Sequence, residues 1–163
     1  MKMNKENMQS ATFMTAIGPV TIEADAQGLT AISLSGRHRR TMKEDRVPDN
    51  PLLQEAARQV REYLQGKRTD FDLPLTIYGT DFQKKVWELI REIPYGKTRS
   101  YGDIARQLGS AAKSRAVGGA AHANSLLLVI PCHRVIGTNG SLTGFGSGLE
   151  LKKKLLELEK KSR

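Results

Sequence analysis

The sequence predicts an α+β protein: a small strand-rich N-terminal domain with one helix, packed on a mainly helical C-terminal domain that contains a helix-turn-helix. Short alternating segments separated by turn residues fill the first part of the chain. Helical stripes with capping residues and glycine-rich loops begin at Gly79. The length of 163 residues allows one ordinary domain or two small ones. We therefore expect an N-terminal domain over residues 1–78 and a C-terminal domain over residues 79–163.

The N-terminal domain is expected to begin with three strands. Residues 12–17 and 20–24 alternate loosely between apolar and polar side chains, with a Gly-Pro turn at residues 18–19 between them. A second turn then leads into residues 29–34, which have the composition of a third strand.

One helix and one further strand complete this domain. Asn50 is expected to cap a helix that has Pro51 at its first position and ends at Gly66. Its apolar residues recur at helical spacing and predict one buried face. Residues 71–77 are apolar enough for a strand, although Pro74 would confine that strand to an edge of the sheet.

The C-terminal domain is expected to contain three successive helices. The first follows a Thr-x-x-Gln capping box at residues 80–83 and ends before Pro94. The second follows a Ser-x-x-Asp capping box at residues 100–103 and ends at Gly109. A short connection then leads to a helix over residues 112–123. Two short helices joined by a tight turn with a glycine predict a helix-turn-helix.

Composition narrows the range of partners and compartments. The 26 basic and 17 acidic residues give a net charge of +9, which favours nucleic acid as a partner, with an anionic membrane second. The longest apolar run, residues 126–130, is far too short to span a membrane, and residues 1–11 lack the apolar core of a signal peptide. Cys132 is the single cysteine, which excludes an internal disulfide and a Cys-rich zinc site. We expect a cytoplasmic protein in a reducing compartment.

The segment of residues 113–123 has an unusual composition for a core helix. It carries the adjacent glycines Gly118 and Gly119 and four alanines, and each glycine destabilises a helix by about 1 kcal/mol relative to alanine. Close approach to a nucleic-acid backbone or groove is one explanation, with Arg115 as the long cation in the middle. Tight packing against another helix is the alternative.

The run Ile130-Pro-Cys-His-Arg-Val-Ile136 places a thiol beside an imidazole and a guanidinium. A lone cysteine is most often a small buried apolar side chain, and a histidine can be a hydrogen-bonded core residue. An adjacent imidazole and guanidinium can instead lower a thiol pKa. In a regular strand Cys132 and His133 would point to opposite faces, so their cooperation requires Pro131 to break the strand.

This run resembles the signature of the O6-alkylguanine-DNA alkyltransferases. The similarity extends upstream to Ser114-Arg-Ala-Val-Gly-Gly119 and Asn124, and downstream through Gly140-Ser-Leu-Thr-Gly144 to the end of the last helix near Glu159. It covers nearly all of residues 80–159 and is weak before them.

The resemblance implies a repair protein that transfers an alkyl group to itself, once and irreversibly. Cys132 would take the alkyl group from O6 of guanine, and also from O4 of thymine, in an in-line displacement. His133 would act as the base through a water molecule, Glu159 would orient His133, and Asn124 would be a hinge that ties the turns of the active site together. No cofactor and no metal would be needed.

The resemblance also implies double-stranded DNA as the partner, bound through the minor groove with the damaged base flipped out. Arg115 would enter the base stack, and the backbone would approach the groove over small residues. The expected DNA contacts are Tyr101, Ser114, Arg115, Ala116, Gly118 and Gly119. The expected base pocket comprises Tyr101, Val135, Phe145, Gly146 and Ser147, with Phe145 where many members carry tyrosine. A monomer is expected, associated with the nucleoid when bound to DNA.

Two other functions are compatible with parts of the sequence. A lesion-recognition or regulatory helix-turn-helix protein would bind DNA without any reaction of Cys132. A Cys-His hydrolase or redox sensor would react without DNA. Neither explains both the Pro-Cys-His-Arg run and the small-residue helix with Arg115. Two further features are expected to be structural: the lysines at 152–154 as a solvated helix face, and Trp87 as a packing residue.

Overall fold

The chain forms an α+β protein of two compact units. The structure, a computed structural model, describes residues 8–34, 45–142, 145 and 148–161. The first unit comprises residues 1–78 together with 125–127, and the second comprises residues 79–124 and 128–163. Most of the basic segment of residues 37–46 lies outside the described residues.

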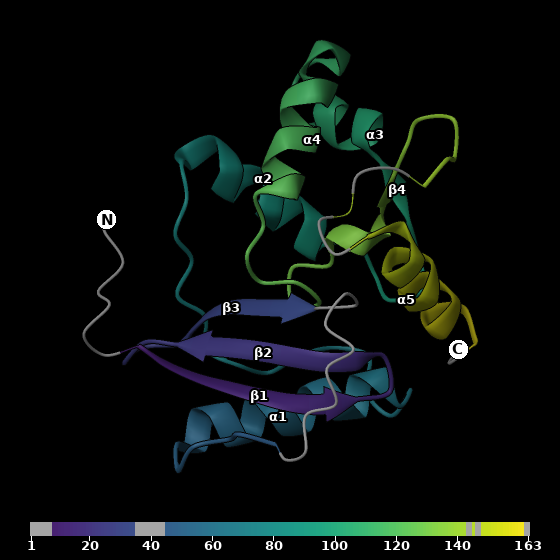
Figure 1. Cartoon of the computed structure of the whole chain (residues 1–163). Coiled ribbons are helices and arrows are strands. Elements are labelled where there is room, and N and C mark those ends of the chain that lie inside the picture. The colour runs from purple at the N-terminus through teal and green to yellow at the C-terminus, as the bar shows by residue number, and fades with distance from the viewer. Residues whose placement is uncertain (1–7, 35–44, 143–144, 146–147, 162–163) are drawn as a thin grey trace. The chain divides into compact units, whose positions relative to one another are not determined.

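The first unit contains a three-stranded antiparallel sheet in the order β1-β2-β3 (Figure 1). The strands are β1 (Gln9–Thr15), β2 (Gly18–Ala24) and β3 (Leu29–Leu34). The predicted turn at residues 18–19 is displaced, because Thr15 pairs with Gly18 and the turn is made by residues 16–17. The Thr15 hydroxyl stabilises this turn: it accepts a hydrogen bond from the Ile17 amide at 3.2 Å and donates one to the Gly18 carbonyl at 2.6 Å.

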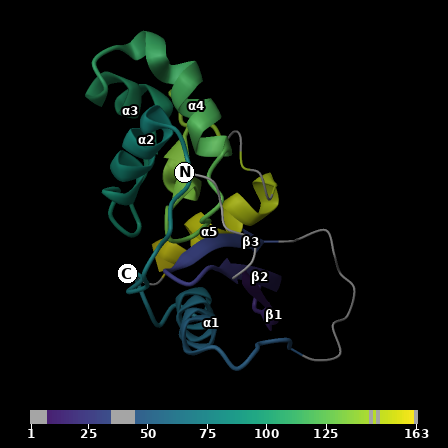
Figure 2. The same ribbon diagram turned by 90° about the vertical axis from the view of Figure 1, so that its left-hand side faces the viewer.

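Helix α1 (Pro51–Leu64) contacts β1 and β2 and covers one face of the sheet, as Figure 2 shows nearly along the helix axis. Its predicted start is confirmed, since the Asn50 side chain accepts hydrogen bonds from the amides of Leu52 and Leu53. Gly66 follows the helix with a φ of 77°, a left-handed conformation that glycine adopts without strain. The core between helix and sheet is formed by fully buried apolar side chains: Phe13, Val20, Ile22, Leu53 and Val60.

Both edges of this sheet are paired with other segments. Thr12 of β1 pairs with Arg46, and the outer edge of β3 pairs with two segments through Leu29–Leu75 and Ile32–Leu126 bridges. The predicted strand over residues 71–77 is therefore reduced to one bridge, because Pro74 has no N–H to donate to a ladder. Covered edges prevent the strands from pairing with other chains.

In the second unit, α2 (Asp81–Arg91), α3 (Tyr101–Gln107) and α4 (Ser114–His122) lie side by side (Figures 1 and 2). The capping boxes at residues 80–83 and 100–103 are both formed. The predicted third helix begins two residues later than expected, at Ser114, because residues Ala111–Lys113 form a 3₁₀ turn before α4. The packing role predicted for Trp87 is confirmed: its indole N–H donates to the Ala120 carbonyl at 2.8 Å.

Two very short strands close this unit around the Cys-His turn. Strand β4 (Arg99–Ser100) pairs in parallel with β5 (Val135–Ile136). Because β4 runs directly into α3 and β5 directly follows residues 132–134, the pairing brings the start of α3 to that turn. Helix α5 (Leu149–Lys161) follows Gly148 and contacts the turn. None of the described helices is long and apolar enough to cross a membrane.

Candidate active site around Cys132 and His133

Cys132 is the first residue of a 3₁₀ turn over Cys132–Arg134 that follows Pro131. The turn is held by hydrogen bonds from the Cys132 amide to the Ile130 carbonyl at 2.8 Å and from the Arg134 amide to the Pro131 carbonyl at 2.9 Å. Residues 132–134 are therefore not in a strand, which would point Cys132 and His133 to opposite faces. This is the break after Pro131 that cooperation of the two side chains requires. The thiol is 6% exposed.

Asn124 connects the end of α4 to this turn. Its side-chain Nδ2 donates to the Ile130 carbonyl oxygen at 2.8 Å and to Cys132 Sγ at 3.3 Å. One buried amide thus fixes the backbone just before the thiol and also contacts the sulfur itself. A donor aimed at sulfur stabilises the thiolate relative to the thiol.

The environment of Cys132 acts on its pKa in opposite directions. Burial raises the pKa of the thiol above its ordinary value, while the Asn124 hydrogen bond and the charge of Lys152 lower it, and burial prevails. The thiol is consequently protonated at neutral pH and needs a base before it can react as a nucleophile. Arg134, whose sequence neighbourhood suggested a direct effect on the thiol, is directed to Glu159 instead.

His133 is fully buried and lies against Glu159, with 2.7 Å between Nε2 and the carboxylate Oε2. Burial lowers the pKa of the imidazole from its ordinary 6.5, although the hydrogen bond and charge of Glu159 oppose this. His133 is therefore neutral at pH 7. Because a carboxylate only accepts hydrogen bonds, the proton of the neutral ring lies on Nε2, which leaves Nδ1 as the basic nitrogen.

The Glu159 carboxylate is held by several donors besides His133. Arg134 donates Nε to Oε1 at 2.8 Å and Nη2 to Oε2 at 2.9 Å, and the Gly96 amide donates to Oε1 at 3.1 Å. The third nitrogen of Arg134 donates to the Ile93 carbonyl at 2.8 Å, and its guanidinium lies 5.6 Å from the centre of the Tyr95 ring. This bidentate pair fixes the position of the carboxylate.

Lys152 corrects one expectation, because it is fully buried rather than part of a solvated helix face. Its ammonium donates to the Val135 carbonyl oxygen at 2.5 Å and lies 5.9 Å from the centre of the Tyr101 ring. Burial lowers the pKa of Lys152, and the Cys132 charge raises it. The structure thus places a cation beside the Cys-His turn, where none was expected from the sequence.

A signal for Lys152 was nevertheless present in the sequence. Lys152 and Glu159 are seven residues apart, with Leu155 between them at helical spacing, so all three lie on one face of α5. Leu155 and Glu159 are buried with it. A lysine on the buried face of a helix, rather than the surrounding run of three lysines, was the informative feature.

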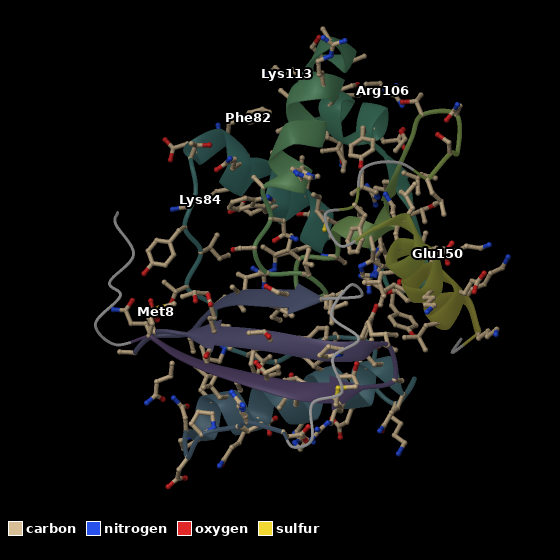
Figure 3. The ribbon with its side chains drawn as sticks, viewed as in Figure 1. Met8, Phe82, Lys84, Arg106, Lys113 and Glu150 are labelled. Carbon is tan, nitrogen blue, oxygen red and sulfur yellow. The ribbon has the colours of Figure 1, made fainter. Side chains whose placement is uncertain are left out.

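The outer face of α4 is smooth. Arg115, Ala116 and Gly119 are exposed, whereas Val117 and Ala120 on the opposite face are buried. A Cβ atom added to Gly118 or Gly119 would meet nothing within 4 Å outside the helix's own nearby backbone. Tight packing against another helix therefore does not explain the two glycines. Two exposed cations lie where α3 ends and α4 begins: Arg106 is in the last turn of α3, and Lys113 directly precedes α4 (Figure 3).

The remaining expected site residues are distributed as follows. Tyr101 is half-buried at the start of α3, and Val135 follows the Cys-His turn directly and is fully buried. Phe145 is also buried. Ser114 is half-buried at the start of α4. Gly146 and Ser147 lie outside the described residues.

Two family models match the chain. The model described as "6-O-methylguanine DNA methyltransferase, ribonuclease-like domain" matches residues 8–77. The model described as "6-O-methylguanine DNA methyltransferase, DNA binding domain" matches residues 81–161 and thus contains the whole Cys-His turn.

Similar proteins are found among curated sequences and solved structures. A methylated-DNA–protein-cysteine methyltransferase of Methanosarcina acetivorans is 43% identical over 153 residues, covering 93% of this chain and 98% of the relative. The crystal structure of Mycobacterium tuberculosis OGT in complex with DNA has a TM-score of 0.82 at 42% identity, covering 94% of this chain and 93% of that one. The O6-methylguanine-DNA methyltransferase of Pyrococcus kodakaraensis strain KOD1 shares the fold, with a TM-score of 0.57 at 24% identity and coverage of 93% and 98%.

Proposed function

This chain belongs to the 6-O-methylguanine DNA methyltransferase family, and from that premise we propose how its own residues repair alkylated DNA. The activity is that of a methylated-DNA–protein-cysteine methyltransferase, which transfers an alkyl group from DNA to a cysteine of the protein. Cys132 is the acceptor, since it is the only cysteine in the chain. The C-terminal domain holds the DNA-binding and acceptor residues.

His133 is the base that activates the thiol. Its Nδ1 accepts the Cys132 proton through a water molecule, because Nε2 is committed to Glu159 at 2.7 Å. Glu159 is a positioning residue that fixes the tautomer and stabilises the imidazolium formed after proton transfer. Asn124 and Lys152 stabilise the thiolate, and both effects lower the pKa of Cys132.

The transfer is a single in-line displacement. The Cys132 thiolate attacks the alkyl carbon, a bond forms between sulfur and carbon, and the bond from that carbon to guanine O6 breaks with its electron pair on the base. The guanine anion takes up a proton and leaves as ordinary guanine in the duplex, so the thiol proton is balanced by the proton gained by the base. The thioether is stable, and each protein molecule therefore reacts once. O4-alkylthymine presents the same bond to the thiolate.

Duplex DNA is bound through the α3–α4 pair, which serves as a helix-turn-helix with α4 in the minor groove. The support for this assignment is the outer face of α4, where Gly118 and Gly119 leave the backbone open to a partner. Arg115 enters the base stack in place of the flipped nucleotide. The basic charge of +9 adds attraction to phosphates that is independent of sequence.

The flipped base enters a pocket next to the Cys-His turn. Tyr101 contacts the target nucleotide, and Val135 and Phe145 provide apolar walls. Phe145 supplies a ring without a hydroxyl, so base contact on that wall is apolar. The protein acts as a monomer, because Cys132, His133, Glu159 and Arg115 are all supplied by one chain.

The observation that carries this proposal is the short path from the buried carboxylate of Glu159 through His133 to the turn that holds Cys132. The test is a titration of a duplex containing O6-methylguanine with increasing protein, followed by counting the restored guanine. We expect one guanine restored per protein molecule, with none by Cys132→Ser. Restoration that continues past one per molecule, or binding without restoration, would contradict the proposal.

A further inference from the structure

The chain enters the first unit a second time just before the proposed active site. Asn124 belongs to the second unit, residues 125–127 belong to the first, and Leu128 belongs to the second again. These three residues therefore lie in the sequence between Asn124 and Ile130. The Asn124 side-chain amide donates hydrogen bonds both to the Ile130 carbonyl and to Cys132 Sγ.

The three residues are attached to the open edge of β3. The Ile32 amide donates to the Ser125 carbonyl at 2.8 Å, and the Ser125 hydroxyl donates to the Thr30 carbonyl at 3.0 Å. Leu126 forms a parallel bridge with Ile32, and its side chain is 2% exposed. Backbone pairing, a side-chain hydrogen bond and apolar burial together fix this short segment against the N-terminal sheet.

The return from the sheet contains a strained residue. Leu128 has a φ of 73°, the left-handed region that leucine rarely adopts. Its side chain is 2% exposed, so the conformation is not a feature of a free loop. Such a conformation is unfavourable for a residue with a Cβ atom and persists only where the surrounding structure holds it on both sides. Here one side is the attachment to β3 and the other is the Asn124–Ile130 hydrogen bond.

From this arrangement we infer that residues 125–127 are an anchor through which the N-terminal sheet positions the proposed acceptor thiol, with Ser125 and Leu126 as positioning residues; the role in repair rests on the proposed function. The anchor fixes the chain between Asn124 and Ile130, so the Asn124 side chain stays directed at both the carbonyl and the sulfur. A loosened anchor releases that amide, and the thiolate then loses its donor. The N-terminal domain, which has no motif of its own, thereby acts on the reactivity of Cys132.

The test measures the pH dependence of Cys132 reactivity toward iodoacetamide in the full-length chain. Because Cys132 is the only cysteine, the mass increase reports that thiol alone and no DNA is required. Leu126→Ala weakens the anchor. Leu53→Ala is the matched control, since it removes the same atoms from a fully buried leucine of the first unit in α1. Leu126→Met restores the apolar contact.

We expect Leu126→Ala to move the midpoint of the pH profile upward by about one pH unit, the shift that loss of a hydrogen bond to a thiolate produces. Asn124→Ala should move it in the same direction by at least as much, whereas Leu53→Ala and Leu126→Met should keep the midpoint of the unsubstituted chain. An unchanged midpoint in Leu126→Ala, or equal shifts in Leu126→Ala and Leu53→Ala, would overturn the inference.

Ser125→Ala keeps the test decisive if Leu126→Ala does not fold. It removes only the hydrogen bond to the Thr30 carbonyl from an exposed residue, and we expect a smaller upward shift of the same midpoint. No shift in a folded Ser125→Ala chain would then count against the anchor. Failure of the unsubstituted chain to take a methyl group from DNA would contradict the proposed function alone, because the iodoacetamide reaction does not depend on it.

Discussion

His133 and Glu159 form a buried pair, with Nε2 of the imidazole 2.7 Å from Oε2 of the carboxylate and neither side chain exposed. The carboxylate also receives two hydrogen bonds from Arg134, so its charge is already compensated before His133 is considered. His133 can therefore remain neutral beside an ionised carboxylate. This is the state in which Nδ1 can accept a proton from Cys132.

The buried neutral imidazole should make the stability of the protein depend on pH. An unfolded histidine has a pKa near 6.5, whereas burial lowers the pKa of His133 in the folded chain. As the pH falls below about 6.5, the unfolded chain takes up a proton that the folded chain does not. The free energy of unfolding therefore falls as the pH decreases, by up to about 1.4 kcal/mol per pH unit. We expect His133→Gln to remove this slope as the pH falls below about 6.5.

Urea unfolding at a series of pH values measures the slope directly. His122→Gln is the matched control, since His122 is exposed at the end of α4. A slope that survives in His133→Gln but disappears in His122→Gln would show that the buried imidazole is not its source.

Lys152 should act on Cys132 through its charge. Its ammonium lowers the pKa of the thiol, and Lys152→Met removes that charge while keeping much of the side-chain volume. We expect the midpoint of Cys132 alkylation to move upward by about half to one pH unit. Lys153→Met is the control, because Lys153 is the exposed neighbour on the same helix. Coincident profiles for the two variants would exclude an electrostatic role for Lys152.

A side chain at position 119 should stabilise the fold but weaken the binding of DNA. Because a Cβ at Gly119 meets nothing in the described chain, Gly119→Ala should raise the free energy of unfolding by about 0.5–1 kcal/mol. Gly119→Leu should weaken binding to duplex DNA by about tenfold or more, since the larger side chain holds the backbone away from the groove. Fluorescence anisotropy measures the affinity. Gln54→Leu adds the same exposed side chain on α1 as a control, and an equal loss of affinity there would remove α4 from the DNA interface.

Arg115 should matter only when a base must leave a stack. Flipping costs a few kcal/mol, so Arg115→Ala should slow repair of O6-methylguanine in a duplex on the order of a hundredfold. Reaction with free O6-methylguanine should change little, because no stack is opened. Single-turnover rates on the two substrates make the comparison. Equal slowing of both would assign Arg115 to the chemistry or to folding instead.

Local signals in the sequence predicted most of the helical structure correctly. The Asn50 cap, the two capping boxes and the stop at Gly109 each involve residues within one helical turn, so their geometry follows from short-range sequence. The break at Pro131 is local in the same way. The Glu159–His133 contact was expected from the family resemblance alone, because no local pattern connects residues on two different elements.

The features that were missed depend on pairing between distant segments. The two-residue strands Arg99–Ser100 and Val135–Ile136 are too short to carry any pattern. The pairing of residues 125–127 with β3 could not be predicted, because a single bridge between Ile32 and Leu126 joins segments that are far apart in the sequence. Lys152 was misplaced because its exposed lysine neighbours dominated the composition of that helix, and its burial depends on the carbonyl of Val135 from another element.

The most direct test of the account is the intact mass of the protein after mixing with a duplex that carries one O6-methylguanine. We expect an increase of one methylene per chain, located by peptide mapping at Cys132 and absent in Cys132→Ser. An unchanged mass together with tight binding to the same duplex would contradict it, and would identify the protein as a sensor of the lesion rather than its acceptor.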